Sequence, residues 1–174
     1  MSESVKHTAC KWGFDVNGVQ VVPDLSGAAW FPELDVLAVA DLHFEKGTSF
    51  VRRGLHLPPY DTKVTLRNLQ AALDLYRPQT VIALGDSFHD GDGPARLDDE
   101  DVAVLRRFTS DMDWIWIYGK HDPVTTEGID RLGGRALEEI VIGSLTFQHE
   151  PTGATGEVAG HLHPGAAVQV RGRR

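Results

Sequence analysis

Apolar residues recur along the chain in short runs, and polar or glycine-containing segments separate these runs. Runs of four to eight residues rich in valine, isoleucine and aromatic residues predict strands, and runs without polar positions are typical of strands buried on both faces. The predicted strands are residues 18–22, 34–40, 80–84, 114–118, 139–143, 144–148, 156–160 and 166–170.

Two segments between these strands show helical spacing instead. Their apolar positions are Leu66, Leu69, Leu73 and Tyr76 in the first segment, and Val102, Leu105 and Phe108 in the second. Pro78 ends the first helix, and the acidic residues 98–101 begin the second, where negative charge favours a helix N-terminus.

The order of these elements is strand, helix, strand, helix and strand, followed by a β-rich portion. This order predicts parallel crossovers and then antiparallel hairpins. We therefore expect the α/β fold class, as a layered sandwich of two mixed β-sheets flanked by helices. With 174 residues, 41% of them hydrophobic, and no repeat or linker, residues 1–174 should form a single domain. Because the sequence stops just after the strand at 166–170, we expect this domain to lack its extreme C-terminal part.

Charge and composition narrow the possible functions. A formal net charge of -8 argues against broad nucleic-acid binding through counterion release, although Lys46, Arg52 and Arg53 could form a local basic patch. The first residues lack the apolar core of a signal peptide, and no apolar stretch approaches the roughly 20 residues of a membrane span, so we expect a soluble, cytoplasmic protein. The single cysteine, Cys10, excludes a cysteine-based zinc cluster, so a metal site would use histidines and carboxylates.

Five polar clusters each follow a predicted strand. The clusters are Asp41 to His43, Gly85 with Asp86, Gly119 to Asp122, His149 with Glu150, and Gly160 to His163. The carboxyl ends of strands in an open α/β sheet are where ligands bind, so these clusters can converge. In extended backbone, residues two apart point to the same side, and glycines allow sharp turns or close approach. The pattern predicts a histidine and aspartate metal centre, for which Mn, Fe, Zn, Co or Ni is suitable.

The order of the motifs resembles that of the calcineurin-like metallophosphoesterases over most of the chain. It runs Asp-x-His, Gly-Asp, Gly-x-His-Asp, His and Gly-His-x-His. The surrounding segments are similar to the bacterial ligase-associated DNA damage response endonuclease group: "VADLHFEKGTSFVRRGLHLPPYDT", "ALGDSFHDGDGPARL", "WIWIYGKHDP" and "GEVAGHLHP". This resemblance implies a metallophosphoesterase domain, hydrolysis of phosphodiester bonds including those of DNA, and a role in DNA repair with a ligase and a helicase.

The resemblance also implies roles for individual residues. Asp41, His43 and His163 would hold one divalent ion, His149 and His161 the other, and Asp86 would bridge them. Manganese is the first choice for both ions, which would share a bridging hydroxide that attacks phosphorus. His121 would act as general acid, Asp90 or Asp122 would orient it, and Arg52 and Arg53 would contact a substrate phosphate.

Lys120 departs from the family pattern. The family has asparagine there, which supplies an amide oxygen to the second ion, whereas an ammonium group cannot bind a cation. We expect Lys120 to weaken the second site; the alternative is that it swings out to solvent.

Three functions therefore stay open. The resemblance favours a nuclease acting on DNA ends or single strands, and the acidic charge favours a phosphatase or phosphodiesterase for small molecules. Lys120 favours a catalytically weakened binding module.

Overall fold

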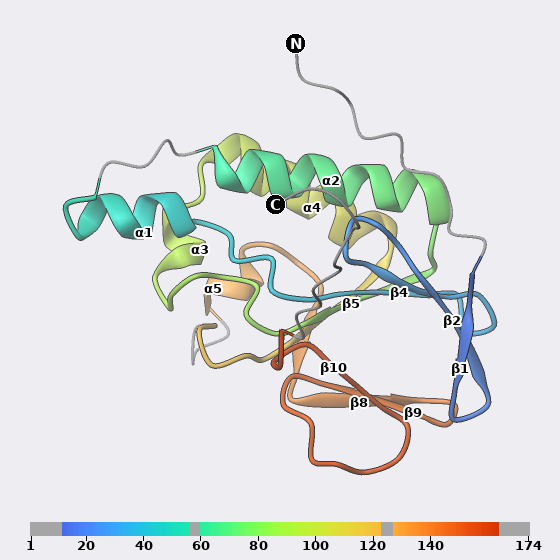
Figure 1. Ribbon diagram of the computed structural model, residues 1–174. Coiled ribbons are helices and arrows are strands. Elements are labelled where there is room, and N and C mark those ends of the chain that lie inside the picture. The colour runs from blue at the N-terminus through green and yellow to red at the C-terminus, as the bar shows by residue number, and fades with distance from the viewer. Residues whose placement is uncertain (1–11, 56–59, 123–126, 164–174) are drawn as a thin grey trace, which may run out of the picture.

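The computed structural model describes residues 12–55, 60–122 and 127–163, which form three layers (Figure 1). A seven-stranded sheet lies in the middle, with α2 (Asp61–Tyr76) and α4 (Asp99–Asp111) on one face and a three-stranded sheet on the other. The strands are β1 (Phe14–Val16), β2 (Val19–Pro23), β3 (Ala29–Phe31), β4 (Val36–Val39), β5 (Thr80–Leu84), β6 (Asp113–Ile117), β7 (Arg135–Leu137), β8 (Glu139–Ile142), β9 (Leu145–Gln148) and β10 (Glu157–Ala159). Three short helices, α1 (Lys46–Arg52), α3 (Gly93–Arg96) and α5 (Glu127–Asp130), gather at one end of the sheet.

Both sheets are mixed, which confirms the expected fold class. In the large sheet, β1 to β4 pair antiparallel and β4 to β7 pair parallel, in sequence order. In the small sheet, β8 is antiparallel to β9 but β10 is parallel to β9. The expectation that this last portion consists only of antiparallel hairpins is therefore wrong. Residues 149–156 carry the chain back to the start of β9, so β9 and β10 end at the same edge.

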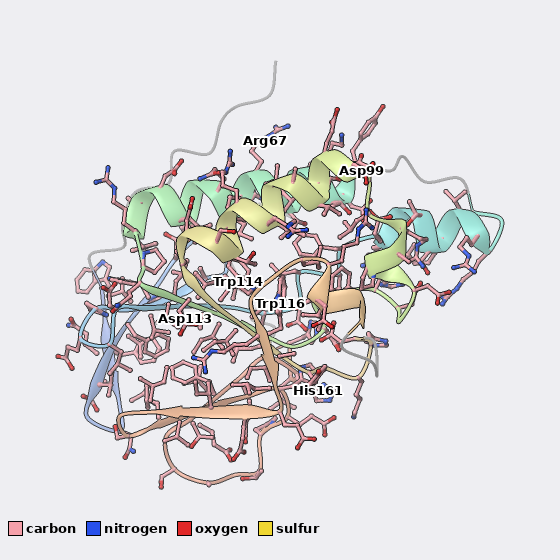
Figure 2. All side chains as sticks on the ribbon, turned by 180° about the vertical axis from the view of Figure 1, so that it is seen from behind. Arg67, Asp99, Asp113, Trp114, Trp116 and His161 are labelled. Carbon is pink, nitrogen blue, oxygen red and sulfur yellow. The ribbon has the colours of Figure 1, made fainter. Side chains whose placement is uncertain are left out.

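Successive side chains of the central strands point to opposite faces of the large sheet, so the hydrophobic core has two parts. In β6, Trp114 and Trp116 pack with the cluster that contains the apolar sides of α2 and α4, and Figure 2 labels both residues just below these helices. Ile115 and Ile117 face the other way and pack with Phe147 of β9. Burial on both faces explains the uninterrupted apolar runs of these strands, because each buried large side chain stabilises the fold by about 1.5–3 kcal/mol.

The two long helices and seven of the predicted strands are confirmed, and the predicted strand at 166–170 lies outside the described residues. The pattern missed β1, β3 and β7, each only three residues long, because such strands are too short to show a period of two. A turn signal could have revealed β1. Asn17 and Gly18, with φ of 51° and 83°, form the two-residue connection of the β1–β2 hairpin.

None of the helices in the described ranges has the length and apolar content needed to cross a membrane.

Candidate metal centre

The polar clusters follow the carboxyl ends of β4, β5, β6, β9 and β10, as expected. Figure 2 shows His161 toward the end of the sheet opposite Asp113, the residue with which β6 begins. The parallel pairing of β10 with β9 puts His161 beside His149, whose carbonyl oxygen accepts a hydrogen bond from the His161 backbone N–H at 3.1 Å. An antiparallel β10 would have carried His161 and His163 to the opposite edge.

Asp41, His43 and His163 form the first group, and one possible ligand atom from each lies within 4.8 Å of the other two. His163 Nε2 is 3.2 Å from Asp41 Oδ1. Asp41 Oδ1 and His43 Nδ1 are nevertheless buried without a hydrogen-bond partner, an arrangement that costs free energy unless a ligand satisfies them. Burial raises the pKa of Asp41 and lowers that of His43, so His43 is held as the neutral imidazole that binds metals. These open atoms fit a divalent cation.

His149 and His161 form the second group. His149 is buried, and its Nδ1 lies 2.9 Å from the carbonyl oxygen of Leu84, so this nitrogen carries the hydrogen and donates it. The lone pair on His149 Nε2 then points toward His161 Nδ1 at 3.2 Å and Asp86 Oδ1 at 3.6 Å. Two nitrogens on one tetrahedral ion with bonds of about 2.1 Å would be about 3.4 Å apart, which is close to the observed separation.

Asp86 lies between the two groups. Its side chain is only 5% exposed, one oxygen is close to His149, and its charge acts on the pKa values of both Asp41 and His43. A buried carboxylate among imidazoles in this position can interact with cations on both sides.

Glycines let the loops approach one another, as the sequence predicts. A Cβ atom at Gly85 would overlap Nδ1 of His149, and one at Gly119 would overlap the backbone nitrogen of Asp86. A Cβ atom at Gly160 would lie 2.8 Å from the Cβ of Ala40. All three contacts are closer than real Cβ contacts, so any larger residue would displace a loop of the site.

The backbone itself is strained at this edge. Asp41, His43, Asp86 and His163 have φ of 51°, 46°, 48° and 41°, in the left-handed region that costs of order 1 kcal/mol or more for such residues. Strain of this kind concentrates at functional sites, where the surrounding structure enforces it.

His121 lies beside the centre, at the end of the loop after β6. Its backbone N–H donates to Asp86 Oδ1 at 3.0 Å, while its imidazole is 57% exposed and places Nε2 3.9 Å from Asp86 Oδ2. In the described part of the chain, the hydrogen bonds of the Asp122 side chain go to backbone groups and not to this ring. The buried Asp122 accepts hydrogen bonds from the backbone of Gly119 at 2.8 Å and Phe88 at 3.0 Å, and so joins the loops after β6 and β5.

Asp90 is held elsewhere. Arg96 donates to its two oxygens at 2.7 and 3.0 Å. Burial opposes ionisation of Asp90, but the hydrogen bonds from Arg96 and Ser49 and the charge of Arg96 outweigh it and lower its pKa to about 2. Within the described ranges no hydrogen bond or ion pair joins Asp90 to His121, and Arg96 binds both carboxylate oxygens of Asp90.

Lys120 pairs with Glu150, the residue that follows His149. Its side chain is 59% exposed, and Nζ lies 2.7 Å from Glu150 Oε1, a hydrogen bond that lowers the pKa of Glu150. The carboxylate of Glu150 therefore offsets the charge of the Lys120 ammonium beside the second group.

The two arginines of the predicted substrate contact differ. Arg52 pairs with Asp92 at 2.9 Å, and Arg53 forms no ion pair with any residue in the described part of the chain.

His89 is a residue of this region that the sequence did not predict. Its ring centroid lies 5.8 Å from that of His43 and 6.4 Å from that of His121, and its plane is within 11° of the His121 plane. His89 follows Asp86 by three residues in the same loop, so its position after β5 was the available signal.

The layered α/β fold is the one expected of a metallophosphoesterase, and histidines and aspartates converge at one edge of its sheets. No protein-family model matches the sequence, and no curated protein matches it significantly. Among solved structures, nuclease MPE from Pseudomonas putida matches with a TM-score of 0.72 and 26% identity, over 88% of this chain and 74% of that chain. The protein of unknown function AQ665 from Aquifex aeolicus matches with a TM-score of 0.47 and 19% identity, over 67% and 60% of the two chains. The match to nuclease MPE confirms the resemblance to the ligase-associated metallophosphoesterase group.

Proposed function

We propose that the chain is a metal-dependent phosphodiesterase that cleaves DNA with a centre for two divalent ions. The observation that carries this proposal is the convergence of two groups of histidines and aspartates at one edge of the sheet, with Asp86 between them. The likeness to nuclease MPE supports a hydrolase that acts on phosphodiester bonds.

Six side chains would supply the ligands. Asp41, His43 and His163 would hold one ion, His149 and His161 would hold the other, and Asp86 would contact both. Manganese is the first choice, with iron, zinc, cobalt and nickel as alternatives, because all of them accept imidazole and carboxylate ligands. When bound, such ions activate water and neutralise charge on the phosphate oxygens.

His121 would act on the leaving group. The hydrogen bond from its backbone to Asp86 fixes the loop, and the imidazole is 57% exposed and therefore accessible to a substrate. A protonated imidazole there would donate its proton to the departing oxygen, and a positioned acid of this kind contributes about 10²- to 10⁴-fold to the rate.

Lys120 supports a second candidate function, that of a catalytically weakened binding module. The ammonium cannot supply the oxygen that asparagine gives to the second ion in the family, whichever way the side chain points. In that case the chain would bind a phosphodiester with one ion in place and turn it over slowly.

A cellular role follows from the resemblance alone. It supports a cytoplasmic function in DNA repair, in association with a DNA ligase and a helicase, by a single metallophosphoesterase domain of residues 1–174.

The test is a set of substrates assayed with Mn²⁺ before and after chelation: an aryl phosphodiester, an aryl phosphomonoester, and single- and double-stranded oligonucleotides. We expect hydrolysis of the diesters that stops on chelation and returns when Mn²⁺ is added. His163→Ala should lose metal, while His121→Ala should keep its metal and lose activity by about 10²- to 10⁴-fold. Hydrolysis that survives complete chelation would contradict the proposal, and a preference for the monoester would indicate a small-molecule phosphatase.

A further inference from the structure

One face of α1 carries an aromatic ring between two cations. Lys46, Phe50 and Arg53 are spaced at i, i+4 and i+7, so they share a face of this helix and its C-terminal cap. Lys46 and Arg53 are exposed, and neither has an ion-pair partner among residues 12–55, 60–122 and 127–163. Arg52, on another side of the helix, is already paired with Asp92.

Aromatic rings connect this face to the candidate metal centre. The half-buried Phe50 ring lies 5.4 Å from the His89 ring, measured between centroids, and the two planes are tilted by 36°. His89 in turn lies parallel to His121 at 6.4 Å and close to His43. The rings therefore form a row that begins on α1 and ends beside the metal ligands.

Buried polar contacts hold α1 in this position. Glu45, which precedes the helix and is buried, accepts hydrogen bonds from Thr62 at 3.0 Å and Thr48 at 2.6 Å. Arg96 donates to Thr48 at 3.0 Å and pairs with Asp90, the residue that follows His89. The helix face and the His89 loop are thus fixed relative to each other before any ligand binds, which lowers the entropic cost of binding.

We infer that Lys46, Phe50, Arg53 and His89 form a stacking strip for an unpaired nucleobase of the substrate strand. The base would stack on Phe50 and His89, and Lys46 and Arg53 would bind the phosphates on either side of it. This inference rests on the proposed function and narrows its substrate to single-stranded nucleic acid, because a base inside a duplex is already stacked between its neighbours.

The charge of the molecule supports stacking as a source of affinity. With a formal net charge of -8, the chain as a whole repels a polyanion, and two unpaired cations compensate for this only locally. Stacking of a base on an aromatic side chain adds affinity that is independent of charge and tolerant of sequence.

The test compares two fluorescein-labelled single strands of equal length, a DNA 12-mer and a 12-mer with abasic residues throughout. Fluorescence anisotropy gives their dissociation constants in Mn²⁺ buffer on ice, with strand integrity checked on a gel. We expect the protein to bind the normal strand roughly 5- to 140-fold more tightly, the gain associated with stacking one base.

Variants assign this preference to the strip. Phe50→Ala and His89→Ala should bring the ratio of the two dissociation constants close to one, while Arg53→Ala should weaken binding of both strands and keep the ratio. Phe50→Leu keeps a large apolar side chain on the helix but removes the ring. It should also lose the preference for the normal strand, which would show that the loss in Phe50→Ala does not come from damage to the helix. Val51→Ala, a truncation of an exposed neighbour on α1, is the matched control and should behave as the parent protein does.

Equal affinity of the parent protein for the two strands, or an unchanged ratio in Phe50→Ala, would overturn the inference. Hydrolysis of an aryl phosphodiester with Mn²⁺, measured in parallel, tests the proposed function without a nucleobase. If that activity is present while the ratio is one, only the stacking strip is wrong.

Discussion

At the scale of single residues, the candidate centre depends on which side-chain atoms keep a free lone pair. The carbonyl oxygen of Leu84 fixes the hydrogen of His149 on Nδ1 and so leaves Nε2 open toward Asp86. Lys120 shows the opposite case, because its ammonium has no lone pair and forms its ion pair with Glu150. In the proposed centre, Lys120 would offer the second ion no ligand, and Glu150 would offset the charge of the lysine.

We predict that Lys120→Asn raises both the manganese content and the rate of phosphodiester hydrolysis. Asparagine adds an oxygen ligand and removes the positive charge of the lysine. Repulsion between that charge and a bound ion would cost about 4 kcal/mol for each unit of charge on the ion, at 4 Å and an effective dielectric of 20. Because Glu150 already offsets the ammonium charge, we expect a gain of about tenfold or more in affinity for the second ion, not the full effect. Elemental analysis and initial rates measure the two quantities.

Lys120→Ala is the control for this experiment, since it removes the charge without adding a ligand. Glu150→Gln removes the partner of the ammonium and should lower affinity for the second ion. Equal metal content and equal rates in the parent protein and Lys120→Asn would show that the lysine has no effect on the centre.

At the scale of elements, loops that must approach closely determine the geometry of the site. Gly85 lies so close to His149 that the space between them has no room for a Cβ atom. Hydrogen bonds to Asp122 hold the loop after β6 against the loop after β5. Arg96 of α3 donates hydrogen bonds to Asp90 and to Thr48 of α1, and so holds α1 and α3 together. These contacts position the functional side chains without touching a substrate themselves.

Gly85→Ala should destabilise the fold by about 2–4 kcal/mol and reduce metal binding. Gly85 has φ of 85°, and an added Cβ would displace His149. Gly153→Ala is the matched control, because Gly153 has φ of 92° and nothing within 4 Å of an added Cβ. Urea denaturation measures the free energy of unfolding of both variants. Both carry the backbone strain, but only Gly85→Ala carries the clash, so equal losses of stability would show that the clash contributes nothing.

The pair between Asp90 and Arg96 should give a pH-dependent contribution to stability. Because the folded pKa of Asp90 is about 2, below its ordinary value of 3.8, the contribution is complete above about pH 4 and is lost as the pH falls toward 2. We expect Asp90→Asn to be less stable than the parent by about 1–2 kcal/mol at pH 6. Urea denaturation between pH 6 and 2.5 should show this difference shrinking, and a difference independent of pH would contradict it.

At the scale of the whole molecule, the sandwich brings residues from opposite ends of the chain to one edge. Asp41 and His163 lie on different sheets, and the covered apolar faces of both sheets fix their separation. Buried, unpartnered ligand atoms in such a fold carry an energetic cost that a cation would remove.

Metal binding should therefore stabilise the folded protein. At a concentration of Mn²⁺ about 100-fold above the dissociation constant, mass action adds about 2.7 kcal/mol. For a chain of this size that corresponds to a rise of about 5–10 °C in the thermal midpoint. Differential scanning calorimetry with Mn²⁺ and with chelator measures the rise, and His163→Ala should show a smaller one. An identical midpoint in both buffers would count against a metal centre in the folded state.

The amino-acid sequence by itself determined the central strands, the two long helices and the types of side chain at each strand end. These features depend on local spacing: a period of two or 3.6 residues decides which side chains share a face, and a glycine before a polar residue marks a tight turn. Gly85, Gly119 and Gly160 were predictable for this reason, and their contacts are as close as expected.

Only the tertiary structure decided the direction of β10, the partners of Asp90 and Lys120, and the place of His89 in the row of rings. Each of these depends on a contact between residues that are distant in the sequence, and many partners are compatible with the same local pattern. Arg96 takes both oxygens of Asp90, and Glu150 takes the ammonium of Lys120, because the packed helices and sheets bring these groups together. The sequence supplied the candidate ligands, and the packing of the two sheets decided which of them meet.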